Sequence, residues 1–240
     1  MKIVSIILFF FVAASEYDMG MLNNLADLIK VKKDKMTILV LGLNNSGKST
    51  IVNHFKKSNE QSAIMVPTVG FLVEQFYTMG VSIKAMDMSG ATRYRNLWEH
   101  QFKNCQGIIY VIDSSDRMRF VVVKDELDLV LQHPDLCNRT VPILFYGNKS
   151  DLEDSLSNVK IAAGMLLSCV QMDLMLNSTR FILALGLDNI KDKPWHICSS
   201  NAISGEGLDE GVQWLVQQIR FAVLSHRKGS KSKHNAKSNK

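Results

Sequence analysis

The chain has 240 residues, enough for one ordinary domain with appendages but too few for two full domains. Its 46% hydrophobic and 21% charged content is close to globular averages, which excludes a disordered chain, a collagen and a multi-span membrane protein. The net charge of +5 belongs to residues 226–240, which hold six cations and no acid. We therefore predict a nearly neutral folded part and no nucleic-acid partner. The basic tail over 226–240 is predicted to be disordered, and it either stays solvated or is drawn to anionic lipid.

The four cysteines stand apart from one another, without a CxxC pair or a cysteine–histidine cluster. This spacing argues against a disulfide framework and a structural zinc site, and it favours free thiols in a reducing compartment such as the cytoplasm. Residues 1–18 nevertheless have the lysine, short apolar run and small residues that are typical of a secretory signal peptide. Two interpretations stay open: a working leader, or translation that begins downstream at Met19.

Residues 19–35 are predicted to form an amphipathic N-terminal helix and a linker. The apolar side chains recur at helical spacing, at Met21, Leu22, Leu25, Leu28 and Ile29. Such a helix either packs on its own domain or lies on a membrane surface. If translation begins at Met19, Gly20 becomes a myristoyl acceptor, although Asn24 stands where that motif requires serine or threonine.

Beyond Met36, strand and helix patterns alternate. Apolar strand patterns cover residues 37–41, 107–112, 141–146 and 195–198, helix patterns cover 48–57 and 210–224, and 71–77 with 81–86 predict a β-hairpin. Strands separated by helices predict an α/β fold over 36–225, with a six-stranded, mostly parallel sheet that has helices on both faces. In such folds ligands bind at the carboxyl ends of the strands.

The first strand is followed by a stretch that fits the pattern G-x-x-x-x-G-K-[ST] and opens a helix. In such a loop the glycines let backbone amides turn inward around phosphate oxygens, and the helix N-terminus adds positive potential. Lys48 would reach the β- and γ-phosphates, and the Ser49 hydroxyl would bind Mg²⁺. The nucleotide contacts predicted here are Gly42, Leu43, Asn44, Asn45, Ser46, Gly47, Lys48, Ser49 and Thr50.

The base is indicated by Asn148, Lys149 and Asp151, which follow another predicted strand in the pattern N-K-x-D. A carboxylate accepts hydrogen bonds from both N1–H and the N2 amino group of guanine, whereas adenine offers neither donor. We therefore predict GTP and GDP as the nucleotides, and Asp151 as the residue that selects them.

Further polar residues stand where a magnesium site needs them. Asp87 ends a predicted strand and would hold Mg²⁺ through water, and the amide of Gly90 would sense the γ-phosphate. Thr68 lies in the loop before the hairpin, and its hydroxyl would complete the Mg²⁺ shell only when a γ-phosphate is present.

In this order the motifs identify a family. The stretches GLNNSGKST, PTVGF, DMSG, RYRNLWEH, VIDSSDR, NKSD, KDKPWHICSS and GEGLDEGVQWL resemble the ADP-ribosylation-factor-like small GTPases, from Met19 to about Leu224. The resemblance implies the small-GTPase form of the P-loop NTPase fold, GTP hydrolysis, an exchange factor, a GTPase-activating protein and a monomer. Within the family, RYRNLWEH and KDKPWHIC are most similar to the branch that recruits the BBSome coat for ciliary membrane traffic.

The same resemblance assigns roles to two further segments. Cys198 and Ser199 are expected at the guanine, with the Ser199 amide donating to the guanine O6. The hairpin at residues 71–86 is expected to shift register between the GDP and GTP states and to expel the N-terminal helix onto a membrane.

The chain departs from the family pattern at the residue after Gly90. Family members normally have a glutamine there that orients the attacking water, whereas this chain has Ala91, whose methyl group cannot hydrogen-bond water. Two interpretations stay open: intrinsic hydrolysis is very slow, or an activating partner supplies the missing group. We assign no catalytic residue.

The effector surface and the chain length also differ. Met86 and Gln101 replace family aromatics, so we predict an effector surface around Phe71 and the retained Trp98 with less contact area. Residues 164–183 are an insertion, because the family spacing before the last strand is roughly twenty residues shorter. They are either a hydrophobic docking helix or translated intron.

These observations predict a GTP-binding switch that is peripheral on cytoplasmic or ciliary membranes, where it recruits effector or coat proteins. Two alternatives remain. One is an adaptor locked in the GTP state without hydrolysis, and the other is a secreted or luminal binding protein.

Overall fold

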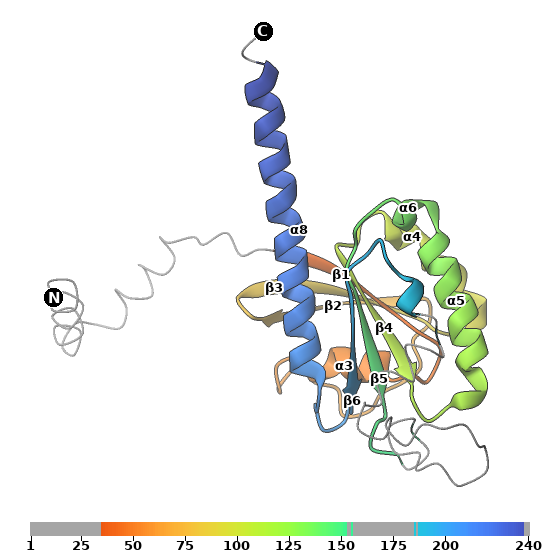
Figure 1. Cartoon of the computed structure of the whole chain (residues 1–240). Coiled ribbons are helices and arrows are strands. Elements are labelled where there is room, and N and C mark those ends of the chain that lie inside the picture. The colour runs from red at the N-terminus through yellow and green to blue at the C-terminus, as the bar shows by residue number, and fades with distance from the viewer. Residues whose placement is uncertain (1–34, 153–154, 156–184, 186, 238–240) are drawn as a thin grey trace, which may run out of the picture. The chain divides into compact units, whose positions relative to one another are not determined.

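The computed structural model describes residues 35–152, 155, 185 and 187–237. The predicted leader, the N-terminal helix with Gly20, and the insertion at 164–183 lie outside these residues. Six strands form one sheet: β1 (Lys35–Leu41), β2 (Phe71–Thr78), β3 (Val81–Met88), β4 (Gly107–Asp113), β5 (Ile143–Asn148) and β6 (Trp195–Ser200). Their order is β2-β3-β1-β4-β5-β6, as predicted for a six-stranded, mostly parallel sheet (Figure 1).

Among the described strands, only β2 and β3 pair antiparallel, because a two-residue turn joins them. Thr78 pairs with Val81, and the turn residues Met79 and Gly80 both have positive φ, as tight hairpin turns require. This confirms the predicted hairpin. The other strands need crossover connections, which the helices supply.

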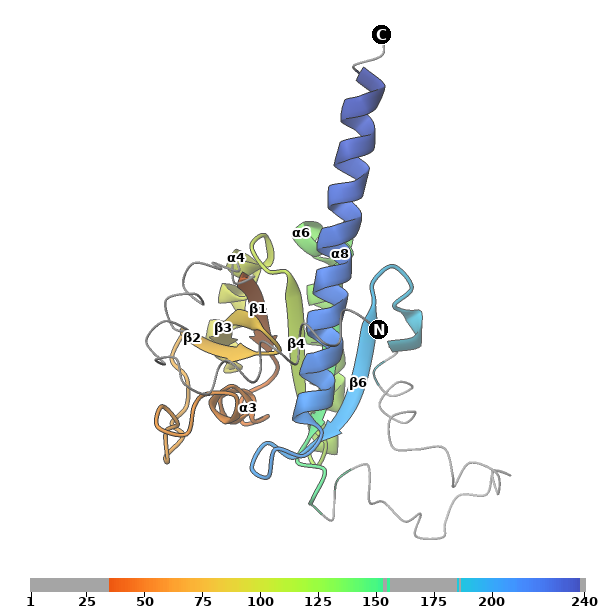
Figure 2. The same cartoon turned by 90° about the vertical axis from the view of Figure 1, so that its left-hand side faces the viewer.

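The helical elements follow the sheet in a layered arrangement. They are α3 (Lys48–His54), η1 (Thr92–Leu97), α4 (Glu99–Phe102), η2 (Arg117–Arg119), α5 (Phe120–Gln132), α6 (Pro134–Cys137), η3 (Leu187–Asn189) and α8 (Leu208–Lys237). Figures 1 and 2 show α3 and α8 over one face of the sheet and α5 over the other.

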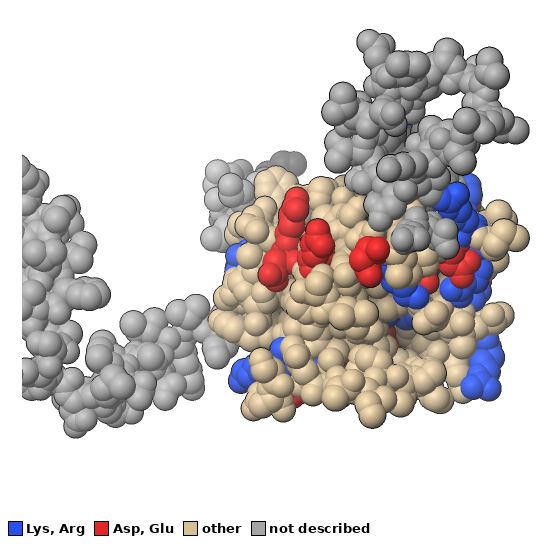
Figure 3. Space-filling view, turned by 90° about the horizontal axis from the view of Figure 1, so that it is seen from below, with Lys and Arg blue, Asp and Glu red and all other residues tan. Residues whose placement is uncertain are grey.

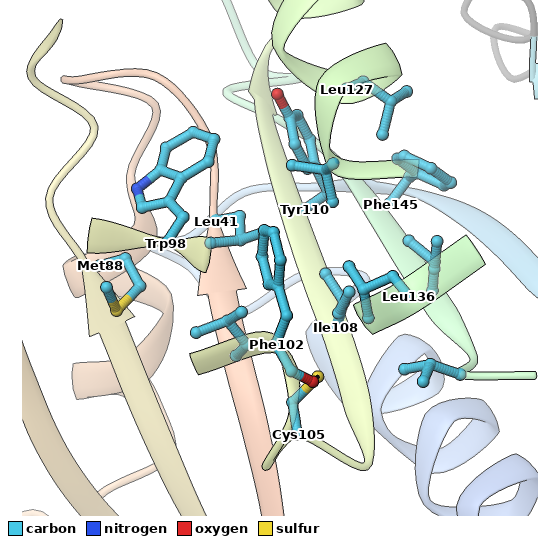
Figure 4. Packing of buried hydrophobic residues seen from close by; sticks show 14 of the residues in the cluster. Leu41, Met88, Trp98, Phe102, Cys105, Ile108, Tyr110, Leu127, Leu136 and Phe145 are labelled. Atoms are coloured by element: carbon cyan, nitrogen blue, oxygen red, sulfur yellow. Dashed lines mark hydrogen bonds between the residues drawn. The ribbon is translucent and has the colours of Figure 1, made fainter. Parts of the chain in front are cut away.

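The strand side chains alternate between two cores, since successive residues of a strand point to opposite faces. On β1, Leu39 and Leu41 join α4, α5 and α6, whereas Ile38 and Val40 join α3 and α8. Figure 4 shows the first core, including Tyr110 of β4, which is fully buried. Both faces are thus covered, which leaves the strand ends to form the site.

Two helices end elsewhere than predicted. The sequence pattern extends the first helix to Lys57, but α3 ends at His54, where the Gln61 side chain donates to the His54 carbonyl at 3.1 Å. The helix predicted over 210–224 is longer in the structure: α8 covers Leu208–Lys237 and so takes in residues 226–237 of the predicted tail. A helix that is already nucleated adds further residues at low cost. Within the described residues, no helix combines the length and apolarity needed to cross a bilayer.

Candidate nucleotide-binding site

The carboxyl ends of the parallel strands meet at one edge of the sheet, where the predicted nucleotide residues gather. A cleft of about 280 Å³ lies at this edge. It is lined by the P-loop, by the segment before the hairpin and by the loop after β3, including Asn44, Gly47, Lys48, Ser49, Thr50, Thr68, Gly90 and Ala91. Figure 3 views the molecule from this side, and much of the surface there is uncharged.

The P-loop has the backbone that a phosphate cradle requires. Gly47 has φ of 96°, and a Cβ on it would lie 2.1 Å from the Asn148 amide nitrogen, so no other residue fits. Lys48 is buried, and its Nζ donates to the Leu43 carbonyl at 2.8 Å, across the loop. Burial lowers the pKa of Lys48 to about 8, although the Asp87 carboxylate opposes that shift. At neutral pH most of the Lys48 amine is therefore still charged, as a contact with phosphate requires.

Three segments converge on the predicted magnesium position. The Ser49 hydroxyl donates to Asp87 Oδ2 at 2.5 Å, and Thr68 Oγ1 lies 3.0 Å from Ser49 Oγ and 3.4 Å from Asp87 Oδ2. Burial raises the pKa of Asp87, against the hydrogen bond from Ser49. The other carboxylate oxygen, Oδ1, is buried without a hydrogen-bond partner among the described residues.

An unpaired buried carboxylate oxygen is costly, so this corner calls for a cationic or hydrogen-bonding ligand. Its donors are two hydroxyls and a carboxylate, which are the hard oxygen ligands that Mg²⁺ prefers. The residues therefore fit the metal: Ser49 and Thr68 would contact it, and Asp87 would hold it through water. When bound, Mg²⁺ supplies charge neutralisation for the β- and γ-phosphates.

Gly90 lies directly against the P-loop. A Cβ on Gly90 would lie 2.2 Å from the Leu43 carbonyl carbon and 2.3 Å from the Asn44 nitrogen, both of them backbone atoms. Glycine is thus required at this close approach. The contact places the loop after β3, including Ala91, beside the phosphate cradle.

Asn148 joins the P-loop to the loop after β6. Its Nδ2 donates to the Ser46 carbonyl at 2.9 Å, and its Oδ1 accepts from the Ala202 amide at 3.0 Å. Lys149 Nζ lies 2.6 Å from Asp113 Oδ2. Although burial opposes it, this contact and the bonds from Ser115 lower the pKa of Asp113, so the pair is ionic.

Asp151 differs from its neighbours because its side chain is exposed at the end of this loop. No described residue is hydrogen-bonded to its carboxylate. That leaves both carboxylate oxygens available for the two donors of a guanine base.

Comparisons with known proteins agree with this site. The model of the ADP-ribosylation factor family matches residues 21–219. The chain belongs to the ADP-ribosylation factor family. It is 50% identical over 202 residues to ADP-ribosylation factor-like protein 6 of Danio rerio, covering 84% of this chain and 98% of that protein. It is 39% identical to ADP-ribosylation factor-like protein 6 of Caenorhabditis briggsae, with 84% and 96% covered.

A solved structure shows the same fold. The chain superposes with a TM-score of 0.65 and 32% identity on the Arl6 BBS3 small GTPase from Trypanosoma brucei with bound nucleotide analogue GppNp, covering 78% of this chain and 98% of that one. This chain is therefore a GTP-binding protein of the ADP-ribosylation factor family, whose members are GTP hydrolases.

The structure places the predicted guanine contacts Cys198 and Ser199 in a strand rather than in a loop. Both lie within β6, where Cys198 is buried in the core and Ser199 pairs with Gly147. The strand extends to Ser200, two residues beyond the predicted end, so the loop starts later. The amide that faces Asn148 is that of Ala202. Ala202 is buried and lies near Gly47 of the P-loop.

The prediction that Trp98 contributes to an effector surface is also wrong. Only 2% of this residue is exposed, and its indole Nε1 donates to the Ser89 carbonyl at 2.9 Å. An indole ring is large and apolar, so it is buried where its N–H finds a partner (Figure 4). Trp98 thus anchors the loop that leads to Gly90, whereas Phe71 on β2 is 42% exposed.

Proposed function

We propose that this member of the ADP-ribosylation factor family is a Mg²⁺-dependent GTP switch with slow intrinsic hydrolysis. The convergence of Ser49, Thr68 and Asp87 supports the switch, because these residues come from three segments that would separate if the loop moved. Thr68 precedes β2, so its place beside Ser49 depends on the register of the hairpin. A shift of β2 against β3 would withdraw it.

The pairing of β2 with β3 also supports the switch. Phe71 pairs with Met88, and the Ser89 amide donates to the Gly70 carbonyl at 2.9 Å, so Thr68 is tied to the end of β3. We take this to be the GTP-like arrangement, in which a γ-phosphate would hold both loops. Loss of that phosphate would free the hairpin to move.

Slow hydrolysis is proposed because Ala91 lines the cleft beside Gly90 with only a methyl group. The experiment is single-turnover hydrolysis of bound GTP by the native chain and by Ala91→Gln, with Ala63→Gln at an exposed loop position as the control. We expect Ala91→Gln alone to raise the rate constant, by about tenfold or more. Equal rates in native and Ala91→Gln chains would refute the assigned role of Ala91.

The same measurement separates the switch from the rival adaptor. A native chain that retains GTP without any turnover above the rate of free GTP would be an adaptor locked in the GTP state. The absence of a water-orienting side chain at Ala91 favours that rival, whereas the dependence of Thr68 on the hairpin register favours the switch.

Guanine selection rests on Asp151, Asn148 and Lys149. We expect Asp151→Asn to weaken GTP binding and to favour xanthosine triphosphate, since an amide offers one donor and one acceptor where guanine needs two acceptors. Competition between the two nucleotides measures this. Unchanged preference for GTP would count against the site.

Recruitment of an effector or coat to a membrane is proposed from the exposed apolar strand β2 at the sheet edge. Phe71, Leu72 and Val73 are 42%, 48% and 45% exposed, which is unusual for such side chains. Binding of a purified BBSome-type coat should require the GTP form and be lost in Phe71→Asp. Leu129→Asp on α5, where Leu129 is 67% exposed, is the matched control.

A further inference from the structure

Asn44 lies in the P-loop, next to the loop that carries Gly90 and Ala91. It is exposed and lines the cleft together with Ala91. Its backbone nitrogen would lie only 2.3 Å from a Cβ on Gly90, so the two loops touch at this point. Asn44 therefore carries a carboxamide on the cleft lining, which it shares with Ala91.

Arg119 of η2 holds this carboxamide from the side. Its Nε lies 2.5 Å from Asp116 Oδ2, which fixes the guanidinium, and its Nη1 donates to the Asn44 carbonyl at 3.0 Å and to Oδ1 at 3.3 Å. These contacts link residues 75 positions apart in the chain. One arginine thus donates to both the backbone and the side chain of Asn44.

The chemistry of arginine sets the orientation of the amide. A guanidinium has donors only, so the amide atom that faces it must be the oxygen. The Nδ2 group is then on the opposite edge of the planar carboxamide, away from Arg119. Asn44 consequently has two N–H donors that Arg119 does not occupy.

We propose that Asn44, positioned by Arg119, donates a hydrogen bond from Nδ2 to the γ-phosphate as GTP is hydrolysed, and so partly replaces the missing glutamine amide. The inference rests on the proposed GTP hydrolysis. In that reaction a bond forms between a water oxygen and the γ-phosphorus, and the bond from this phosphorus to the β–γ bridging oxygen breaks. The electron pair stays on GDP and the proton leaves on phosphate. Asn44 is unchanged and stabilises the charge on the equatorial oxygens.

The test is single-turnover hydrolysis of bound GTP by the full chain and by Asn44→Ala, with GTP affinity and nucleotide dissociation measured in parallel. We expect the rate constant to fall about tenfold, the value of one hydrogen bond made in the transition state. Asn104→Ala, an exposed change before β4 at the opposite edge of the sheet, should have no effect. A native or faster rate in Asn44→Ala would overturn the proposal.

Two double variants test the roles of Asn44 and Arg119 further. In Ala91→Gln the restored amide makes Asn44 partly redundant, so Asn44→Ala should cost less there. Arg119→Ala should slow hydrolysis in the native chain but not in Asn44→Ala, because Arg119 is a positioning residue that acts through Asn44. An equal effect of Arg119→Ala in both backgrounds would overturn that role.

Failure of this inference and failure of the proposed function give different results. If the chain does not bind GTP, the proposed switch itself fails. If it binds GTP and hydrolyses it at the same rate with and without the Asn44 carboxamide, the switch stands and only this inference falls.

Discussion

Asn148 gives the sharpest test of how the site is assembled, and we predict that Asn148→Ala destabilises the protein before any nucleotide is added. The side chain is 1% exposed and bridges the P-loop to the loop after β6. Its Nδ2 satisfies the Ser46 carbonyl at 2.9 Å, and its Oδ1 satisfies the Ala202 amide at 3.0 Å. The substitution by alanine removes the hydrogen-bond partner of the Ser46 carbonyl and that of the Ala202 amide.

The size of the effect follows from the two groups left behind. A buried polar group that loses its partner costs about 1–3 kcal/mol, so the two together predict a loss of about 2–6 kcal/mol in the free energy of unfolding. That is a large share of the roughly 5–15 kcal/mol that holds a typical domain together. The loss should reach the P-loop directly, since Gly47 is packed against Asn148.

Urea unfolding of nucleotide-free protein, followed by circular dichroism, measures this loss from the shift of the midpoint at unchanged slope. Asn104→Ala is the control, because Asn104 is exposed and lies at the opposite edge of the sheet. If Asn148→Ala lowers the free energy of unfolding no more than the control does, Asn148 is not a structural link between the two loops and the reasoning is refuted. Loss of GDP binding without any destabilisation would refute it equally.

Three further predictions concern the same site. Because burial sets the pKa of Lys48 at about 8 and phosphate binds only its charged form, GDP binding takes up a proton above that pH. Affinity should therefore fall by up to about tenfold per pH unit above 8, but not in Lys48→Arg, as calorimetry in buffers of different ionisation enthalpy would show. Gly90→Ala brings a Cβ within 2.2 Å of the P-loop backbone, so GTP affinity should drop more than GDP affinity in fluorescence titrations, and an equal drop would contradict this. Trp98→Phe leaves the Ser89 carbonyl unpaired, and a loss of about 1–3 kcal/mol is expected in urea unfolding; no loss would show that water replaces the indole.

Local chemistry explains which parts of the site are predictable. The P-loop and the N-K-x-D loop each follow an apolar strand, and Asp87 lies near the end of one. At these places the residue types and their short spacing are enough to predict which ligand group they bind. The hairpin is predictable for the same reason, since Met79 and Gly80 form a tight turn between alternating strands. In all these cases the determining interactions lie within a few residues along the chain.

Where the structure differs from the expected position of a residue, the cause is strand register or burial, and neither can be read from the local sequence. The family resemblance implies that Ser199 lies at the guanine, but pairing of Asn148 with Ser200 keeps β6 extended and brings Ala202 beside Asn148. The resemblance also implies that Trp98 lies at the surface, but its ring is buried in the core that contains Met88 and Val123. Both outcomes depend on partners 50 or more residues away or on the packing of several elements at once.

By itself, then, the sequence determined the kind of ligand, because phosphate, guanine and Mg²⁺ each demand particular residue types at short, fixed spacings. Only the tertiary structure decided how those residues meet. It brought Ser49, Thr68 and Asp87 into one corner, and it set Arg119 against Asn44 across 75 positions of chain. The physical reason is that hydrogen bonds between distant segments form only after strand order and core packing have fixed the backbones that hold them.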